Sequence, residues 1–144
     1  MKFYIACDHA GFNIKDRVKE IVKSLGHTII DLGTNSNERV DYPDFAHKLS
    51  LEVLNDEGSY GILICGTGIG MSLSANKHKG IRAALCYDAY TAKMARAHND
   101  ANVLCFGERV VGLGEVESII ESWCRTPFEG GRHANRVKKI EIEQ

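Results

Sequence analysis

The sequence predicts a single α/β domain, an open and mainly parallel five-stranded sheet with helices on both faces, in a Rossmann-like three-layer sandwich. Short apolar runs rich in β-branched and aromatic residues recur along the chain, as expected of strands buried on both faces of a parallel sheet. Segments with helical periodicity separate these runs. With 144 residues, 44% of them hydrophobic, the chain is long enough for one domain with a real core.

The five expected strands are the apolar runs at residues 3–7, 28–32, 60–65, 81–87 and 103–106. Helical spacing is clearest between the first two strands, where one face carries Ile14, Val18, Ile21, Val22 and Leu25. Gly26 is expected to end that helix. Four more helices are expected: one from about Pro43, one after Gly70, one over residues 88–98 and one that ends before Pro127. Right-handed crossovers bring the carboxyl ends of all strands to one edge, where open sheets bind ligands.

The chain divides into an α/β core over residues 1–126 and a charged tail over residues 127–144. The tail opens with Gly130 and Gly131 and continues as RHANRVKKIEIEQ, with no apolar face for the central core. We therefore expect the tail to form a terminal helix that contacts a partner subunit.

Composition excludes several classes of function. A net charge of −1 and a pI near 6.6 provide no global field for nucleic acid or for an acidic membrane. The first residues resemble neither a secretory signal nor a membrane span, so a cytoplasmic protein is expected. Five cysteines without a Cys-x-x-Cys pair predict reduced thiols, with neither disulfides nor a structural metal.

Cys65 is the strongest candidate for chemistry. It ends the third expected strand, and a loop of three glycines follows at once. At the ligand edge of the sheet, backbone N–H groups and a helix N-terminus would stabilise a thiolate. The alternative is a buried strand cysteine without a catalytic role, which is the interpretation for most of the other four.

The loop Gly66, Thr67, Gly68, Ile69 and Gly70 has the composition of an anion cradle. Its glycines allow the backbone to turn tightly and to approach an anion closely, and Thr67 adds a hydroxyl. The spacing matches neither the Walker pattern nor the dinucleotide pattern Gly-x-Gly-x-x-Gly. A simple tight turn is the alternative, and Asp88 lies at the distance expected of a ribose-binding carboxylate in a nucleotide site.

Asp8 and His9 follow the first strand and should lie on the same edge as Cys65. A carboxylate and an imidazole there can move protons between sugar oxygens. The alternatives are a helix N-cap for Asp8 and an exposed loop position for His9. A metal site that includes Cys7 is disfavoured, because adjacent strand residues point to opposite faces.

Basic residues near the end of the chain could hold an anionic group. Arg132 and Arg136 share one helix face at i and i+4, although a solvated basic stripe is the alternative. Arg109 follows the fifth strand at the ligand edge. Tyr42 could line the pocket or pack against the core.

His98 and Asn99 close the fourth helix before the fifth strand. A cation at a helix C-terminus is common in proteins without a catalytic role. The candidacy of His98 therefore depends on the other groups.

Together these residues resemble a known family, the type B ribose-5-phosphate isomerases, which are grouped with the galactose-6-phosphate isomerase subunits. The matching stretches are IACDHAGFNIK, CGTGIGMSLSANK, KGIRAALCYDAYTAKMARAHNDANVL and GGRHANRVKKI, which cover most of the chain in the expected order. One branch of that family uses a glutamate directly after the glycine loop as base. Met71 stands there in this chain, which therefore resembles the branch that uses a cysteine.

The resemblance implies interconversion of ribose 5-phosphate and ribulose 5-phosphate without metal or organic cofactor. It also implies a homodimer, with tetramers as a further possibility, whose sites combine residues of both subunits. By similarity, Cys65 is the base, His98 the acid that opens the sugar ring, and residues 66–70 the anion hole. The resemblance assigns the sugar oxygens to Asp8, His9 and Asn99, and the phosphate to Arg109, Arg132 and Arg136. The alternatives are isomerisation of allose or galactose 6-phosphate and a non-catalytic phosphosugar- or nucleotide-binding module.

Overall fold

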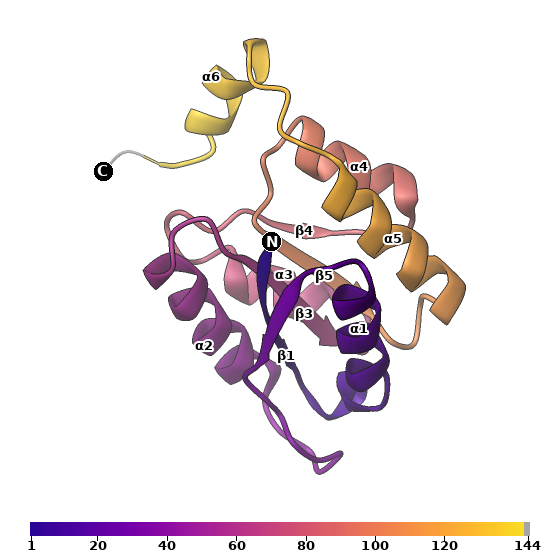
Figure 1. Cartoon of the computed structure of the whole chain (residues 1–144). Helices are drawn as coiled ribbons and strands as arrows, with labels where there is room; N and C mark the ends of the chain where they lie inside the picture. The colour runs from indigo at the N-terminus through magenta and orange to yellow at the C-terminus, as the bar shows by residue number, and fades with distance from the viewer. Residues whose placement is uncertain (143–144) are drawn as a thin grey trace.

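The computed structural model describes residues 1–142 and confirms the predicted fold class (Figure 1). The strands are β1 (Lys2–Cys7), β2 (Thr28–Asp31), β3 (Tyr60–Cys65), β4 (Ala83–Leu85) and β5 (Val103–Gly107). They form one sheet in the order β2-β1-β3-β5-β4, and every neighbouring pair is parallel. The strand order reverses its direction between β1 and β3, which is where open sheets of this kind form a ligand crevice.

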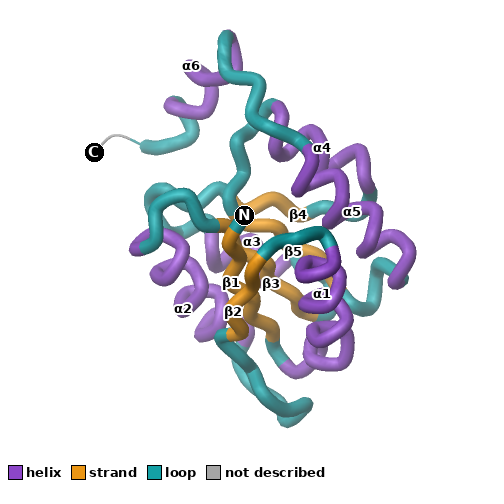
Figure 2. Tube along the Cα trace, viewed as in Figure 1, coloured by secondary structure: helices purple, strands orange, loops and turns teal. Residues whose placement is uncertain are grey.

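Helices cover both faces of the sheet (Figures 1 and 2). They are the short 3-10 turn η1 (His9–Gly11), then α1 (Phe12–Ser24), α2 (Tyr42–Asn55), α3 (Ile69–Ala75), α4 (Ala89–Ala97), α5 (Leu113–Arg125) and α6 (Arg132–Lys138). One buried cluster joins α1, α4 and α5 to one face of the sheet, and a second joins α2 and α3 to the other. The two clusters lie between the sheet and the helices on either side of it, so the molecule is a three-layer sandwich.

The sequence pattern explains where α1 forms and ends. Its buried residues include Ile14, Val18 and Ile21, which share one face as predicted. The N–H of Leu25 donates to the carbonyl of Ile21, and Gly26 follows with φ of +87°. A left-handed residue stops the helix and returns the chain to β2.

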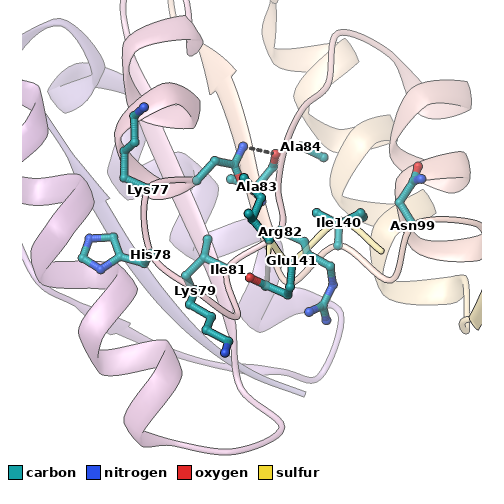
Figure 3. A pocket seen from close by; sticks show the side chains of 13 residues that line it. Lys77, His78, Lys79, Ile81, Arg82, Ala83, Ala84, Asn99, Ile140 and Glu141 are labelled. Atoms are coloured by element: carbon teal, nitrogen blue, oxygen red, sulfur yellow. Dashed lines mark hydrogen bonds between the residues drawn. The ribbon is translucent and has the colours of Figure 1, made fainter. Parts of the chain in front are cut away.

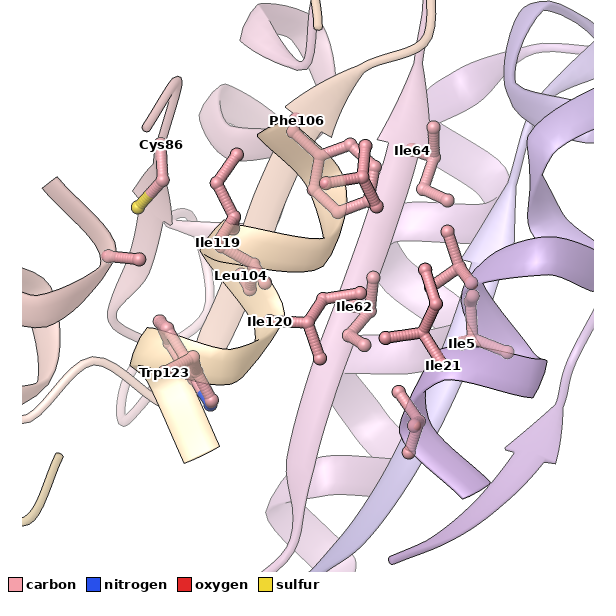
Figure 4. Close-up of a cluster of buried hydrophobic side chains, with 14 of the residues drawn as sticks. Ile5, Ile21, Ile62, Ile64, Cys86, Leu104, Phe106, Ile119, Ile120 and Trp123 are labelled. Atoms are coloured by element: carbon pink, nitrogen blue, oxygen red, sulfur yellow. The ribbon is translucent and has the colours of Figure 1, made fainter. Parts of the chain in front are cut away.

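The larger core cluster lies under α1, α4 and α5 (Figure 4). Trp123 and Ile120 of α5 and Ile21 of α1 lie over the strand residues of this face, and Trp123 has no exposed surface. Burial of one large apolar side chain contributes about 2–3 kcal/mol. This core keeps the sheet rigid beneath its ligand edge.

The structure shortens two of the predicted strands. β4 covers three residues instead of residues 81–87, because the N–H of Arg82 donates to the side chain of Asn102 at 2.8 Å instead of to a strand. At the other end, Asp88 caps α4, so the chain has left the sheet by then. β2 ends at Asp31, one residue earlier than expected.

The predicted terminal helix is present as α6, which lies apart from the core near the edge where the strands begin (Figure 1). The last two residues of the expected tail, 143 and 144, lie outside the described residues. Among the residues that are described, none of the helices combines the length and the apolar character needed to cross a membrane.

Candidate active site

Cys65 is the last residue of β3, as predicted, and its side chain meets the loop that follows. The N–H of Gly68 donates to Sγ of Cys65 at 3.1 Å. Gly68 has φ of +82°, and this left-handed conformation turns its N–H back toward the strand end. A backbone donor directed at sulfur stabilises the thiolate form.

The other four cysteines have surroundings that keep them as thiols. Burial raises the pKa of Cys7 and of Cys124 to about 11, and that of Cys86 to about 12. Burial also raises the pKa of Cys105, which lies wholly inside the sheet. These four therefore carry almost no thiolate near pH 7.

An open cavity of about 430 Å³ lies over Cys65. It brings together nine residues that the sequence singled out: Asp8, His9, Tyr42, Cys65, Gly66, Thr67, Ile69, Gly70 and Arg109. Ala10 and Leu73 complete the lining. The cavity contains a thiol, a carboxylate, an imidazole and a guanidinium, which are groups able to transfer protons and to bind an anion.

The glycine loop is confined by close backbone packing. A Cβ on Gly107 would lie 2.4 Å from the backbone of Thr67, and one on Gly70 would lie 2.3 Å from the ring of Tyr42. Tyr42 thus both packs on the loop and lines the cavity. The N–H of Ile69 donates to Oγ1 of Thr67 at 3.2 Å.

Asp8 combines the two roles that the sequence left open. Its Oδ1 accepts from the N–H of Ala10 at 2.9 Å, so it caps η1, and its side chain also lines the cavity. A Cβ on Gly11 would lie 2.6 Å from the carbonyl oxygen of Ile64. The absence of that Cβ allows η1 to lie directly against the end of β3.

His9 is not a free loop side chain. Its Nδ1 accepts from the N–H of Val40 at 3.2 Å, so the neutral ring carries its proton on Nε2. The same loop places Arg39 beside His9 in an adjoining cavity of about 530 Å³. The sequence analysis did not single out Arg39, since a basic residue in a polar loop carries no distinct signal.

Arg109 is positioned by the end of β5. The N–H of Arg109 donates to the carbonyl of Gly66 at 3.1 Å, and the N–H of Glu108 donates to the carbonyl of Cys65 at 3.0 Å. The Glu108 carboxylate accepts from the N–H of Ile14 at 2.7 Å. These bonds join α1, β3 and β5 around the thiol.

A second group of predicted site residues lines a pocket away from Cys65. His98, Asn99, His133, Arg136, Val137 and Ile140 line a pocket of about 270 Å³. Helix α4 runs antiparallel to the strands, so His98 at its end lies where the strands begin, while Cys65 lies where β3 ends. Six strand residues separate these edges by about 20 Å. Within one chain, His98 does not reach Cys65.

Bonds within the turn after α4 fix the position of His98. Asp100 has φ of +47°, and its carboxylate lies 3.0 Å from Arg96 and 3.5 Å from Arg82. Arg96 is buried and also donates to the carbonyl of Ala101. This network holds the turn that carries His98 and Asn99.

Helix α6 carries Arg132 and Arg136 at i and i+4, as predicted. Arg136 lines the His98 pocket, whereas Arg132 is exposed beside it. His133, between them, stacks on His98 with ring centroids 4.2 Å apart. The sequence analysis missed this partner, although the stretch GGRH contains it.

The alternative interpretation of Asp88 as a ribose ligand loses support. Asp88 accepts from the N–H of Thr91 at 2.7 Å in a capping box, and this bonding lowers the pKa of Asp88. It is a helix cap and not a free ribose ligand. Met71, at the position of the glutamate in the other branch, is fully buried and contributes no acid or base.

The side chains of His98, Glu129 and His133 place three potential metal-ligand atoms within 4.8 Å of one another. The stacked imidazoles have planes only 13° apart, so their in-plane nitrogen lone pairs lie in two nearly parallel planes and do not converge on one point between the rings. A zinc site requires ligands that converge on one point. The absence of a metal from the chemistry stays a prediction.

A larger cavity of about 670 Å³ lies on the far side of α3, against the C-terminal segment (Figure 3). Lys77, Lys79 and Arg82 make it basic, and Asn99 is the only residue predicted for the site among those that line it within residues 1–142. Its lining residues within 1–142 include no thiol, and its imidazole and carboxylate are engaged elsewhere, His78 with His47 and Glu141 with the N–H of Gly80. Cavity size alone therefore does not identify the reactive centre.

The fold and the Cys65 cavity define a class: an α/β protein with a thiol and an anion-binding loop at the switch point of its parallel sheet. The family model described as Ribose/Galactose Isomerase matches residues 3–140. The chain belongs to that family.

Relatives of known structure and name are similar over the whole length. The chain is 48% identical to ribose-5-phosphate isomerase B of Escherichia coli, over 99% of this chain and 97% of that protein. The structure of ribose-5-phosphate isomerase B from Clostridium thermocellum is 51% identical with a TM-score of 0.94, over 97% and 95% of the two chains. That of the type B enzyme from Trypanosoma brucei is 48% identical with a TM-score of 0.94, over 96% and 95%.

Proposed function

We propose that this protein interconverts ribose 5-phosphate and ribulose 5-phosphate by proton transfer through an enediolate. The observation that carries the proposal is the position of Cys65 at the end of β3. Its sulfur accepts a hydrogen bond from the N–H of Gly68, and Cys65 lines a cavity together with Asp8 and Arg109. Full-length identity near 50% to enzymes named for this reaction supports it.

In the proposed reaction, the Cys65 thiolate removes the proton from C2 of the open-chain aldose. The electron pair forms the C1–C2 double bond, and the carbonyl oxygen O1 becomes an oxyanion. O1 then gains a proton as the C2 hydroxyl loses one, and Cys65 returns its proton to C1 to yield the ketose. Asp8, which lines the same cavity, is suited to move the proton between the two oxygens.

In the glycine loop, one backbone N–H bonds to the proposed base and two others remain for the substrate. The N–H of Gly68 is directed at Cys65. The N–H groups of Gly66 and Thr67 donate to no protein acceptor within residues 1–142, and they are the donors for the developing oxyanion. Each such donor contributes about 3 kcal/mol to transition-state stabilisation.

The complete site needs a second copy of the chain. His98, Asn99 and Arg136 lie at the opposite sheet edge from Cys65, and α6 extends away from its own core. In a homodimer with closed symmetry, the His98 pocket of each subunit lies over the Cys65 cavity of the other. His98 then opens the sugar ring, while Arg132 and Arg136 bind the phosphate together with Arg109.

Deuterium exchange tests the activity directly. The purified protein is incubated with ribose 5-phosphate in deuterated water, and NMR follows ribulose 5-phosphate formation and exchange at C1 and C2. We expect both conversion and exchange. A protein that binds the sugar phosphate without exchange would be a binding module, and faster conversion of allose 6-phosphate would assign it a six-carbon substrate.

A further inference from the structure

Two groups beside His98 have no role in the proposed chemistry, namely Glu129 and His133. One oxygen of the Glu129 carboxylate lies 3.7 Å from Nε2 of His98, and the other lies 3.6 Å from Nε2 of His133. The two imidazoles are stacked with planes 13° apart. One carboxylate therefore faces both rings at ion-pair distance.

The main chain holds Glu129 in this place. Its N–H donates to the carbonyl of Ala97, the residue before His98, at 3.0 Å. Gly130 and Gly131 follow with φ of +67° and +55°, a conformation that favours glycine. They turn the chain so that α6 brings His133 over the His98 ring. The positions of the Glu129 carboxylate and of the His133 ring therefore both depend on the turn at Gly130 and Gly131.

The charges around His98 leave one unengaged acid. The charged and titratable groups near its ring are Glu129, His133, Arg132, Arg136 and, on its own turn, Asp100. Asp100 is paired with Arg96 at 3.0 Å. Burial lowers the pKa of His133, and the charges of His98 and Arg132 lower it further, which disfavours a positive charge on that ring. Within residues 1–142, Glu129 is the carboxylate that can favour a positive charge on His98.

We infer that Glu129 is a positioning residue for His98: its carboxylate favours the protonated imidazole and, with His133, holds the ring in the orientation that opens the sugar. The inference rests on the proposed function of His98. In ring opening, the C1–O4 bond breaks, O4 takes a proton from His98, and the proton of the C1 hydroxyl passes to water as the C1 carbonyl forms. Glu129 touches none of these atoms and acts through His98.

The test compares Glu129→Gln with Glu115→Gln, a matched change at an exposed glutamate of α5. Glutamine retains the shape and the backbone bond to Ala97 and removes only the charge. Three quantities are measured: aldose conversion against pH, deuterium exchange at C1 of ribulose 5-phosphate, and the pH midpoint of the His98 ring resonance by NMR. Exchange at C1 of the ketose needs Cys65 but no ring opening.

We expect Glu129→Gln to slow aldose conversion about fivefold, the usual size of a half-exposed ion pair. The alkaline limb of the profile and the His98 midpoint should both move to lower pH, because the carboxylate charge that faces the ring is gone. Ketose exchange should stay at the wild-type rate, and Glu115→Gln should change nothing. An unchanged His98 midpoint, or an equal loss of conversion and exchange, would overturn the inference. Wild-type protein without exchange would refute the proposed function instead, and the NMR midpoint would still test Glu129.

Discussion

At the scale of single residues, the surroundings of the cysteines separate Cys65 from the other four. Cys65 accepts a backbone N–H and lines a cavity, whereas burial raises the pKa of Cys7, Cys86, Cys105 and Cys124. A general base must meet its substrate and be available as the thiolate. Within residues 1–142, Cys65 is the cysteine that lines the cavity, whereas the raised pKa of the other four keeps them as thiols.

Replacing Cys65 with alanine should abolish turnover and retain substrate binding. General-base catalysis contributes on the order of a thousandfold, so conversion of ribose 5-phosphate should fall by at least that factor. Binding is measured as the rise in Tm with ribose 5-phosphate, which should remain. Cys124→Ala is the control, because Cys124 lies outside the cavity. Activity near the wild-type level in the Cys65 variant would remove the thiol from the mechanism.

At the scale of the elements, the site depends on how closely the strand ends approach the glycine loop. Gly107, the last residue of β5, lies against the backbone of Thr67, and Gly11 lies against the carbonyl of Ile64. The segment after β2 is held by polar bonds instead. Lys15 is buried and bonds to Asp31 at 2.9 Å and to the carbonyl of Thr34.

Gly107→Ala should displace the glycine loop. Its new Cβ would lie 2.4 Å from backbone atoms of Thr67, which no side-chain rotation relieves. We expect a loss of about 2 kcal/mol of unfolding free energy, measured by urea denaturation, and a lower kcat. Gly114→Ala in α5 meets nothing within 4 Å and should instead stabilise the protein by about 0.5–1 kcal/mol. Equal effects of the two changes would contradict the role given to the contact.

Asp31→Asn should weaken the fold and flatten its response to acid. Burial would raise the pKa of Asp31, but bonds from Lys15, the N–H of Gly33 and Lys19 hold it below the ordinary 3.8. Its contribution to stability is therefore present above pH 3.8 and is lost as the pH falls through the lower folded value. Leaving the Lys15 ammonium buried and unpaired should cost about 3 kcal/mol at pH 7.

Urea unfolding between pH 7 and pH 3 measures both effects of the Asp31 change. The exposed Asp16 provides the control, because its carboxylate also pairs with Lys19 but 85% of that side chain is in solvent, so Asp16→Asn removes a charge without unpairing Lys15. If wild-type protein and the Asp31 variant lose stability equally below pH 4, the ion pair does not supply the acid response.

At the scale of the whole molecule, each chain carries two separated parts of the proposed site. The Cys65 cavity lies where the strands end, and the His98 pocket lies where they begin, with α6 beyond it (Figure 1). A rigid sheet keeps these parts apart. The proposed homodimer unites them across the interface.

Mixed dimers test this arrangement. Cys65→Ala and His98→Asn chains with different tags are co-expressed, and the heterodimer is purified. Because one site receives both changes and the other receives neither, the heterodimer should show about half of the wild-type activity. Each variant alone supplies the inactive control. An inactive heterodimer, or the failure of the two chains to associate, would contradict a site shared between subunits.

Local patterns in the sequence were sufficient for the class of fold, the helix α1 and the position of Cys65. A buried apolar run ended by a glycine loop places its last residue at the ligand edge of any parallel sheet, whatever the order of its strands. The same argument placed Asp8 and Arg109 there, and both line the Cys65 cavity.

Only the tertiary structure decided which of the candidate groups meet. His98, Arg132 and Arg136 matched a motif, but their separation from Cys65 follows from α4 running back along the sheet to the opposite edge. Glu129 and His133 gather at His98 through the turn at Gly130 and Gly131 and a backbone bond to Ala97. Periodicity reports the environment of each residue, whereas contacts between distant segments depend on strand order and helix direction, which no local pattern encodes.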